Sequence, residues 1–339
     1  MAKPYYGAQF IAACVAYAAI TTSAAAQQHT PAQPGQETEI AAIDLPSVLI
    51  APIVLDRSDR MTLPVTIAGQ GPFGFIVDTG AERTVLSREL ADRLGLRSAG
   101  NARVVGLADT VTTAMFHLDT MALHDVMLAE SIVPTFAQRD IGGPGLIGIE
   151  SLENHKVIID FITQRLDIRP SVRSRSRQRE LDFDRDAIVV TGRRVAGRMI
   201  LSNARIGNHR IEVVIDTGAQ SSIGNLALQR LVRRELGRSG AALHRTELRS
   251  VTGATLDAVV GVIGAITVSG VDFMDLPVVY ADSPAFAALG LDQRPTIMLG
   301  MDALQLLDRI AIDFTNRRVT FDLPDGAQRM MPRRFAFAQ

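Results

Sequence analysis

Phe75-Ile76-Val77-Asp78-Thr79-Gly80-Ala81 is the stretch of this 339-residue chain that decides its fold, because it returns as Val213-Val214-Ile215-Asp216-Thr217-Gly218-Ala219. Each copy is an apolar, β-branched run that predicts a buried strand and closes in Asp-Thr-Gly-Ala. One Asp-Thr-Gly arises often by chance, and a lone aspartate commonly serves a turn. Two copies in register, 138 residues apart, indicate an internal repeat.

The repeat extends beyond these motifs. An apolar pair closed by glycine follows in each half, as Leu146-Ile147-Gly148 and as Met298-Leu299-Gly300, and a hairpin signal comes next at 156–168 and at 309–321. Short β-branched runs between Gly, Pro and Asp turns outnumber helical patterns. The sequence therefore predicts a mainly β protein of two homologous lobes. Modest helices are expected at 87–94, at 226–236 and after each late glycine.

Composition narrows the classes of function. The chain has 35 Lys and Arg against 36 Asp and Glu, so no overall field attracts nucleic acid or an anionic membrane. The single cysteine, Cys14, lies near the N-terminus, and a chain trimmed there has no thiol for disulfides, thiolate catalysis or bound zinc. The six histidines show no metal-ligand spacing, and no phosphate-binding loop is found. We predict neither a metal nor a cofactor.

The first 26 residues are typical of a secretory signal peptide. Lys3 precedes an apolar run at 8–20, and Ala24-Ala25-Ala26 fits the small-residue cleavage site. A periplasmic or secreted protein is therefore expected. In the alternative reading, Cys14 carries the lipid of a lipoprotein. No later stretch reaches about 18 uninterrupted apolar residues, so no membrane span is predicted.

The rest of the chain divides by composition. A Gln-, Pro- and Thr-rich leader at 27–46 is expected to be unfolded. The N-terminal lobe is predicted at 47–170 and the C-terminal lobe at 181–325, with a tail at 326–339. Between the lobes, 171–180 holds four arginines without an apolar period, which predicts an exposed linker. Such a basic run could also bind an acidic partner or be cleaved.

The motif residues suit a crowded twofold centre. Glycines at 80 and 218 let backbone approach backbone closely. The threonine hydroxyls at 79 and 217 can bond to the opposite loop. If the loops meet across a pseudo-twofold axis, Asp78 and Asp216 cannot both ionise and share one proton. The ionised partner can then activate a water while the protonated one donates to a substrate carbonyl, which is peptide hydrolysis without a covalent intermediate.

These residues resemble the aspartic proteases, and the retropepsin-like branch more than the large pepsins. Retropepsins assemble two identical chains, whereas this sequence is similar to two such units in one chain. The resemblance implies a monomer of two retropepsin-like β-barrel lobes related by a pseudo-twofold axis. It also implies site roles: the catalytic pair Asp78 and Asp216, the supporting loops of Thr79, Gly80, Ala81, Thr217, Gly218 and Ala219, the glycines Gly148 and Gly300 behind the pair, and substrate flap tips at Val104–Ala108 with Gly106 and at Val251–Thr255 with Gly253.

Some residues depart from that family pattern. Glu82 and Gln220 stand where retropepsins usually have Asp or Asn. Pepsins use a flap tyrosine, but Tyr280, the only tyrosine outside the predicted signal, lies far past the second motif. Neither half shows the Gly-rich flap of the viral enzymes. We therefore expect substrate closure to differ.

The sequence thus predicts an exported aspartic endopeptidase that holds an extended peptide between two lobes by strand-like pairing. The alternative is a noncatalytic peptide-binding or scaffold module with the same fold. In a third arrangement, each lobe pairs with its counterpart in another molecule.

Overall fold

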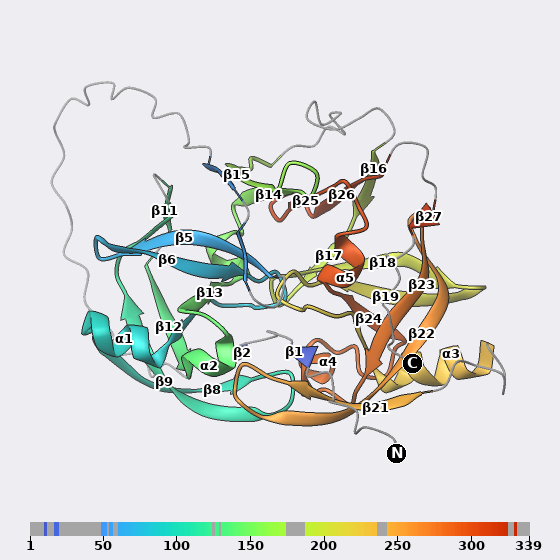
Figure 1. Cartoon of the computed structure of the whole chain (residues 1–339), viewed down its shortest axis with the longest axis horizontal. Helices are drawn as coiled ribbons and strands as arrows, with labels where there is room; N and C mark the ends of the chain where they lie inside the picture. Colours follow the sequence, from blue (N-terminus) through green and yellow to red (C-terminus); the bar gives the residue numbers. More distant parts are fainter. Residues whose placement is uncertain are drawn as a thin grey trace, which may run out of the picture.

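Two β lobes stand side by side and share a third sheet in the computed structural model of the chain (Figure 1). The structure describes residues 10–11, 17–19, 49–52, 54–56, 60–123, 126–128, 130–173, 187–235, 243–324 and 329–330. The mainly β class and the two homologous lobes predicted from the repeat are confirmed.

The first half builds one sheet around the strand that ends at Asp78. Its order is β11-β10-β5-β6-β13-β7-β12-β9-β8-β2, with β4 beside β5. The strands are β2 (Tyr17–Ala19), β4 (Val54–Leu55), β5 (Met61–Ile67), β6 (Gln70–Val77), β7 (Val85–Ser87), β8 (Ser98–Val105), β9 (Thr110–Leu118), β10 (Met121–Leu123), β11 (Val126–Leu128), β12 (Ser131–Phe136) and β13 (Gly145–Ile147).

The second half repeats this plan. Its sheet has the order β1-β21-β22-β18-β19-β24-β20-β23-β27, with β17 beside β18. The strands are β1 (Phe10–Ile11), β17 (Arg193–Val195), β18 (Arg198–Ile206), β19 (His209–Ile215), β20 (Ile223–Gly224), β21 (His244–Arg249), β22 (Thr255–Val268), β23 (Val271–Tyr280), β24 (Thr296–Leu299) and β27 (Arg329–Met330). In each half the aspartate-bearing strand pairs in parallel with the strand before the late glycine, β6 with β13 and β19 with β24.

The two late hairpins of the repeat merge into the shared sheet. Its order is β16-β26-β25-β14-β15-β3, where β14 and β25 are the inner strands of the two hairpins and pair antiparallel. The strands are β3 (Leu49–Pro52), β14 (His155–Asp160), β15 (Arg165–Pro170), β16 (Ile188–Thr191), β25 (Arg309–Asp313) and β26 (Arg318–Asp322). One ladder therefore joins the halves on the side away from the hairpins β8–β9 and β21–β22 (Figure 1).

Short helices cover the lobes where the sequence places them. The helix α1 (Arg88–Leu94) begins after Ser87, whose hydroxyl accepts from the Leu90 amide, and α3 (Leu226–Glu235) begins after Asn225, whose side chain accepts from the Leu228 amide. The late glycines are followed by a 3-10 turn, η1 (Ile149–Ser151), and by α5 (Met301–Leu304). Two further short helices, α2 (Gln138–Ile141) and α4 (Pro284–Ala288), were not predicted because neither spans enough residues to show a period.

Several predicted segments lie largely outside the described residues. Of the signal peptide at 1–26 only β1 and β2 are described, and of the linker only 171–173. The leader at 27–46 is outside entirely, and of the tail at 326–339 only β27 is described. The lobe boundaries stay predictions. Within the described part of the chain, no helix is long and apolar enough to cross a membrane.

The packing of the shared sheet predicts how much each of two isoleucines contributes to stability. Ile159 on β14 is fully buried, pairs with Ile310 of the other half and packs in the main apolar cluster, whereas Ile162 in the adjacent turn is 68% exposed. Ile159→Ala should lower the free energy of unfolding by about 2–5 kcal/mol, because truncation removes apolar contacts and leaves a cavity. Ile162→Ala should change it by less than about 0.5 kcal/mol. Urea titrations followed by circular dichroism measure both, and equal effects would contradict the packing described.

Candidate active site

The two motif aspartates meet at the seam between the lobes. The strand β6 ends directly before Asp78 and β19 directly before Asp216, and both aspartates are fully buried. Their backbone amides donate to matching carbonyls, Asp78 to Ile147 and Asp216 to Leu299, each at 3.0 Å. The local geometry around each aspartate is thus the same in both halves, as the repeat requires.

The threonines of the motifs bind the two loops to each other. The Thr79 hydroxyl donates to the Ile215 carbonyl at 3.0 Å and accepts from the Thr217 amide at 3.0 Å. Reciprocally, the Thr217 hydroxyl donates to the Val77 carbonyl at 2.8 Å and accepts from the Thr79 amide at 3.0 Å. All four bonds cross between halves in a buried setting, so they fix the distance between the loops.

The motif glycines leave room for the opposing carboxylate. A Cβ atom on Gly80 would stand 2.4 Å from the carboxyl carbon of Asp216, and one on Gly218 would stand 2.1 Å from that of Asp78. The close approach is therefore between each glycine and the opposite aspartate side chain, and not only between backbones as the sequence suggested. Any side chain at 80 or 218 would push the two acids apart.

The late glycines pack behind the loops. A Cβ on Gly148 would lie 2.2 Å from the backbone of Arg83, and one on Gly300 would lie 2.6 Å from that of Ser221. Both contacts are with backbone atoms, which cannot move away by a change of rotamer as side-chain atoms can. The strands β13 and β24 therefore come as close to the dyad loops as the backbone allows.

The surroundings of Asp78 favour its protonated form. Burial raises the pKa of Asp78 well above its usual value, and the neighbouring Asp216 carboxylate raises it further. The amides of Gly80 and Ala81, which donate to Oδ1 at 2.8 Å and 3.0 Å, and the charge of Arg198 lower that pKa in part. Oδ2 of Asp78 is buried and receives no hydrogen bond from the described residues. The arrangement suits a carboxyl pair that shares a proton and titrates as a unit.

Comparison with known proteins agrees with this geometry. The sequence model of a family described as aspartyl protease matches residues 63–150 and 202–303, which is more than half of the chain and one match in each lobe. The chain belongs to the aspartyl protease family. Its two lobes are retropepsin-like, as the motif residues implied.

This aspartyl protease is also similar to a curated eukaryotic protein. DNA damage-inducible protein 1 of Kluyveromyces lactis is 34% identical over 94 residues, which cover 26% of this chain and 22% of that protein. The match thus spans about a fifth of the relative's length.

The tips of two hairpins, one from each half of the aspartyl protease, touch each other. Gly106 lies in the turn between β8 and β9, and Gly253 in the turn between β21 and β22, where the flap tips were predicted. The Thr252 hydroxyl donates to the Asp109 carboxylate at 2.7 Å, so the tips touch each other.

Each tip also packs into the opposite lobe. Leu107 lies in an apolar cluster of the second half, and Val251 in one of the first half. Both are buried, at 0% and 2% exposure. Asp78 and Asp216 are themselves fully buried in this arrangement.

Sequence reasoning missed a carboxylate that braces each dyad loop. The Asp302 carboxylate accepts from the Ser222 amide at 3.0 Å and from its hydroxyl at 2.7 Å. In the first half, Glu150 accepts from the Thr84 amide at 2.5 Å. The signal was present, since both acids stand two residues after a late glycine.

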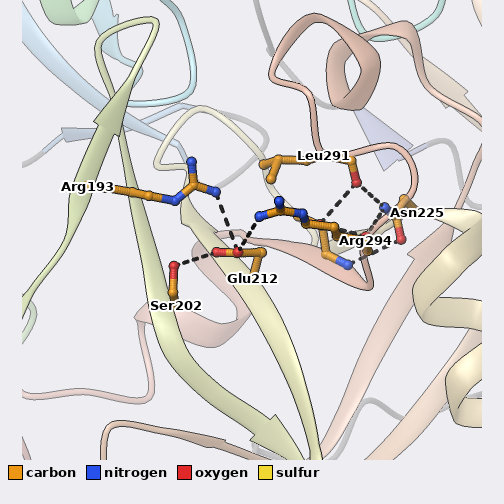
Figure 2. A network of polar contacts seen from close by, with 7 residues as sticks. Arg193, Ser202, Glu212, Asn225, Leu291 and Arg294 are labelled. Carbon is orange, nitrogen blue, oxygen red and sulfur yellow. Dashed lines mark hydrogen bonds and ion pairs between the residues drawn. The ribbon is translucent and has the colours of Figure 1, made fainter.

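A further network steadies the strand that delivers the second aspartate (Figure 2). Glu212 on β19 accepts from the Ser202 hydroxyl at 2.7 Å and pairs with Arg193 and Arg294, each at 3.5 Å. The Asn225 side chain donates to the Arg294 carbonyl at 2.6 Å. These contacts join β17, β18, β19, the start of α3 and the segment before β24.

The brace at Asp302 makes a pH-dependent prediction. Burial raises the pKa of Asp302 from 3.8 to about 6, against hydrogen bonds that lower it. The folded state therefore favours the protonated acid, and this stabilisation is fully present below pH 3.8 and is lost as the pH rises through 6. In the wild type, this loss lowers the free energy of unfolding by up to about 3 kcal/mol as the pH rises. Asp302→Asn should remove that pH-dependent decrease. Urea titrations at pH 3.5 and pH 7 measure it, and a variant that follows the wild-type pH dependence would contradict the assignment.

Proposed function

We propose that this aspartyl protease is an exported endopeptidase that cleaves peptide bonds with a water activated between Asp78 and Asp216. The observation that carries the proposal is the dyad itself: two buried carboxylates, each against the glycine of the opposite motif, held by four reciprocal threonine bonds. Membership in the family supports peptidase activity in general.

The chemistry follows from one shared proton. The ionised carboxylate takes a proton from water as the water oxygen attacks the carbonyl carbon of the peptide. The protonated carboxyl donates to the carbonyl oxygen, and a tetrahedral diol forms. As the C–N bond breaks, the departing nitrogen receives a proton from the carboxyl that gained one, and the other carboxylate takes back a proton from a hydroxyl of the diol, which becomes the carbonyl of the new carboxyl group. The pair ends with one proton, as it began.

The outer edges of the hairpins β8–β9 and β21–β22 are the proposed place for an extended substrate. The strand β1 pairs in parallel with β21, and β2 pairs antiparallel with β8. Residues of the predicted signal peptide thus occupy the outer edges of both closing hairpins. This supports the view that these edges take up an extended backbone by strand addition.

A noncatalytic binding module is the weaker reading. A peptide groove needs no paired acids, and burying two carboxylates without a chemical role is unfavourable. Because a single chain supplies both aspartates, the proposed site is complete in a monomer.

Replacing either aspartate tests the proposal. Asp78→Asn and Asp216→Asn should each lower kcat on a peptide library by about 10²–10⁴-fold, because each removes one partner of the acid–base pair. Circular dichroism checks the fold, and Asp160→Asn, at the end of β14 in the shared sheet, is the control that should keep full activity. Loss of activity in only one of the two variants would contradict a shared dyad, and peptide binding without cleavage by the wild type would favour the scaffold reading.

The strand pairing of residues 10–11 and 17–19 predicts that removing the signal peptide affects activity. A chain that begins at Gln27 should have a higher kcat/KM for peptides than the full chain, because the edges of β8 and β21 are then open. The kcat/KM of each purified form is measured on the same peptides. Equal kcat/KM values would show that the edges play no part in substrate access.

A further inference from the structure

A cavity of about 450 Å³ in the second lobe is lined by β17, β18, β19 and the end of β16. Neither dyad loop lines it. A cavity of this size accepts a small molecule. Its polar and charged lining residues are Thr191, Arg193, Ser202, Asn203, Arg205 and Arg210. We call it the basic cavity, because its lining contains three arginines and no acidic residue.

Two of these arginines lie directly opposite each other. Arg205 on β18 pairs in register with Arg210 on the antiparallel β19, and both residues are exposed. Like charges at opposed positions of two strands repel each other and destabilise the sheet. Within the part of the chain that the structure describes, neither side chain forms an ion pair or a hydrogen bond with another residue. An anion held between them would remove this repulsion.

The third arginine shares its acidic partner. Arg193 pairs with Glu212 at 3.5 Å, and Glu212 also pairs with Arg294 at 3.5 Å (Figure 2). Nη2 of Arg193 is buried and makes no hydrogen bond to a described residue. One carboxylate thus serves two guanidiniums, so the positive charge around the basic cavity exceeds the negative charge.

The fold itself does not require these arginines. The hairpin β5–β6 of the first half takes the same place in the repeat as β18–β19, and each hairpin delivers an aspartate of the dyad. Residues 61–77, which form β5–β6, contain no lysine or arginine. The positive charge is therefore a property of the second lobe and not of the plan that both lobes share.

Donor chemistry and strand pairing indicate what the basic cavity can hold. Guanidinium groups donate paired N–H bonds to phosphoryl and carboxylate oxygens, and a phosphoryl group brings about two negative charges and three acceptor oxygens. The strand β18 is already paired on both sides at Arg205, with Arg210 of β19 and with Thr267 of β22. An extended peptide therefore finds no strand edge to join there. A compact anion bound by side chains fits this place better than a peptide.

We propose that the basic cavity binds a small anion that carries phosphoryl groups. Arg205 and Arg210 hold the anion from opposed strands, and Arg193 supplies further donors. Soluble phosphate esters and the headgroups of phospholipids share this chemistry. The proposal does not depend on peptidase activity, because binding at the basic cavity is measured without a peptide substrate.

Calorimetric titration of the full chain with pyrophosphate, at an ionic strength of about 0.15 M that screens weak surface attraction, tests the proposal. Arg205→Gln and Arg210→Gln should each weaken binding about 10–100-fold, because each removes charge-assisted hydrogen bonds. Arg88→Gln removes the same charge from an exposed position on α1 of the other lobe, and this control should bind as the wild type does. No binding by the wild type, or an equal loss in Arg88→Gln, would overturn the proposal.

Thermal unfolding gives a second readout, which a merely structural role of the arginines would not produce. Without pyrophosphate, Arg205→Gln should have a higher Tm than the wild type, because the repulsion between opposed arginines is gone. Pyrophosphate should raise the Tm of the wild type and leave that of Arg205→Gln unchanged, because a ligand stabilises only the chain that binds it. An equal rise in both would overturn the proposal.

Two further probes identify the source of the phosphoryl group. Vesicles of phosphatidic acid in phosphatidylcholine that sediment with the wild type but not with Arg205→Gln would identify a lipid headgroup. Pyrophosphate binding without vesicle binding would identify a soluble phosphate ester. A poly-aspartate peptide that binds more tightly than pyrophosphate would make the ligand an acidic peptide and overturn the proposal.

Discussion

Two carboxylates buried within reach of each other are the constraint on which the rest of this molecule depends. Bringing Asp78 and Asp216 out of water is unfavourable unless they share a proton and the loops around them are held rigidly. The reciprocal bonds of Thr79 and Thr217 provide that rigidity from both sides. Gly80 and Gly218 follow these threonines. Because they have no side chain, they leave room for the carboxylate of the opposite aspartate.

The rest of the fold supports this seam. Behind it, the late glycines let β13 and β24 press on the dyad loops, and the braces at Glu150 and Asp302 fix the turns that follow. The shared sheet joins the halves through β14 and β25. On the other side, each hairpin tip packs into the opposite lobe. Leu107 and Val251 are each buried in an apolar cluster of that lobe.

Local pattern was enough to predict much of this arrangement. The apolar runs ending at Asp78 and Asp216 predicted strand ends, and the equal spacing of the later motifs predicted a second lobe of the same plan. Contacts between distant segments carry no such local signal. Nothing in the sequence of the hairpins at 156–168 and 309–321 shows that they pair with each other. The packing of each hairpin tip in the opposite lobe depends on the relative orientation of the lobes, which local sequence does not encode. Arg198 could have been noticed, because Arg-Met stands at the same offset before both motifs, but its partner across the seam could not.

The two halves differ in the charged residues near the dyad loops. Arg60 pairs with Asp56 within its own half, whereas Arg198 donates to the Gly80 carbonyl of the opposite half, and Glu82 stands in the repeat where the second half has the uncharged Gln220. Neutron diffraction from a deuterated crystal near pH 5 measures the dyad most directly. It should show the carboxyl oxygens of Asp78 and Asp216 within hydrogen-bond reach, with one deuteron on the pair. Carboxylates held apart, or a pair carrying no deuteron, would contradict a shared-proton dyad.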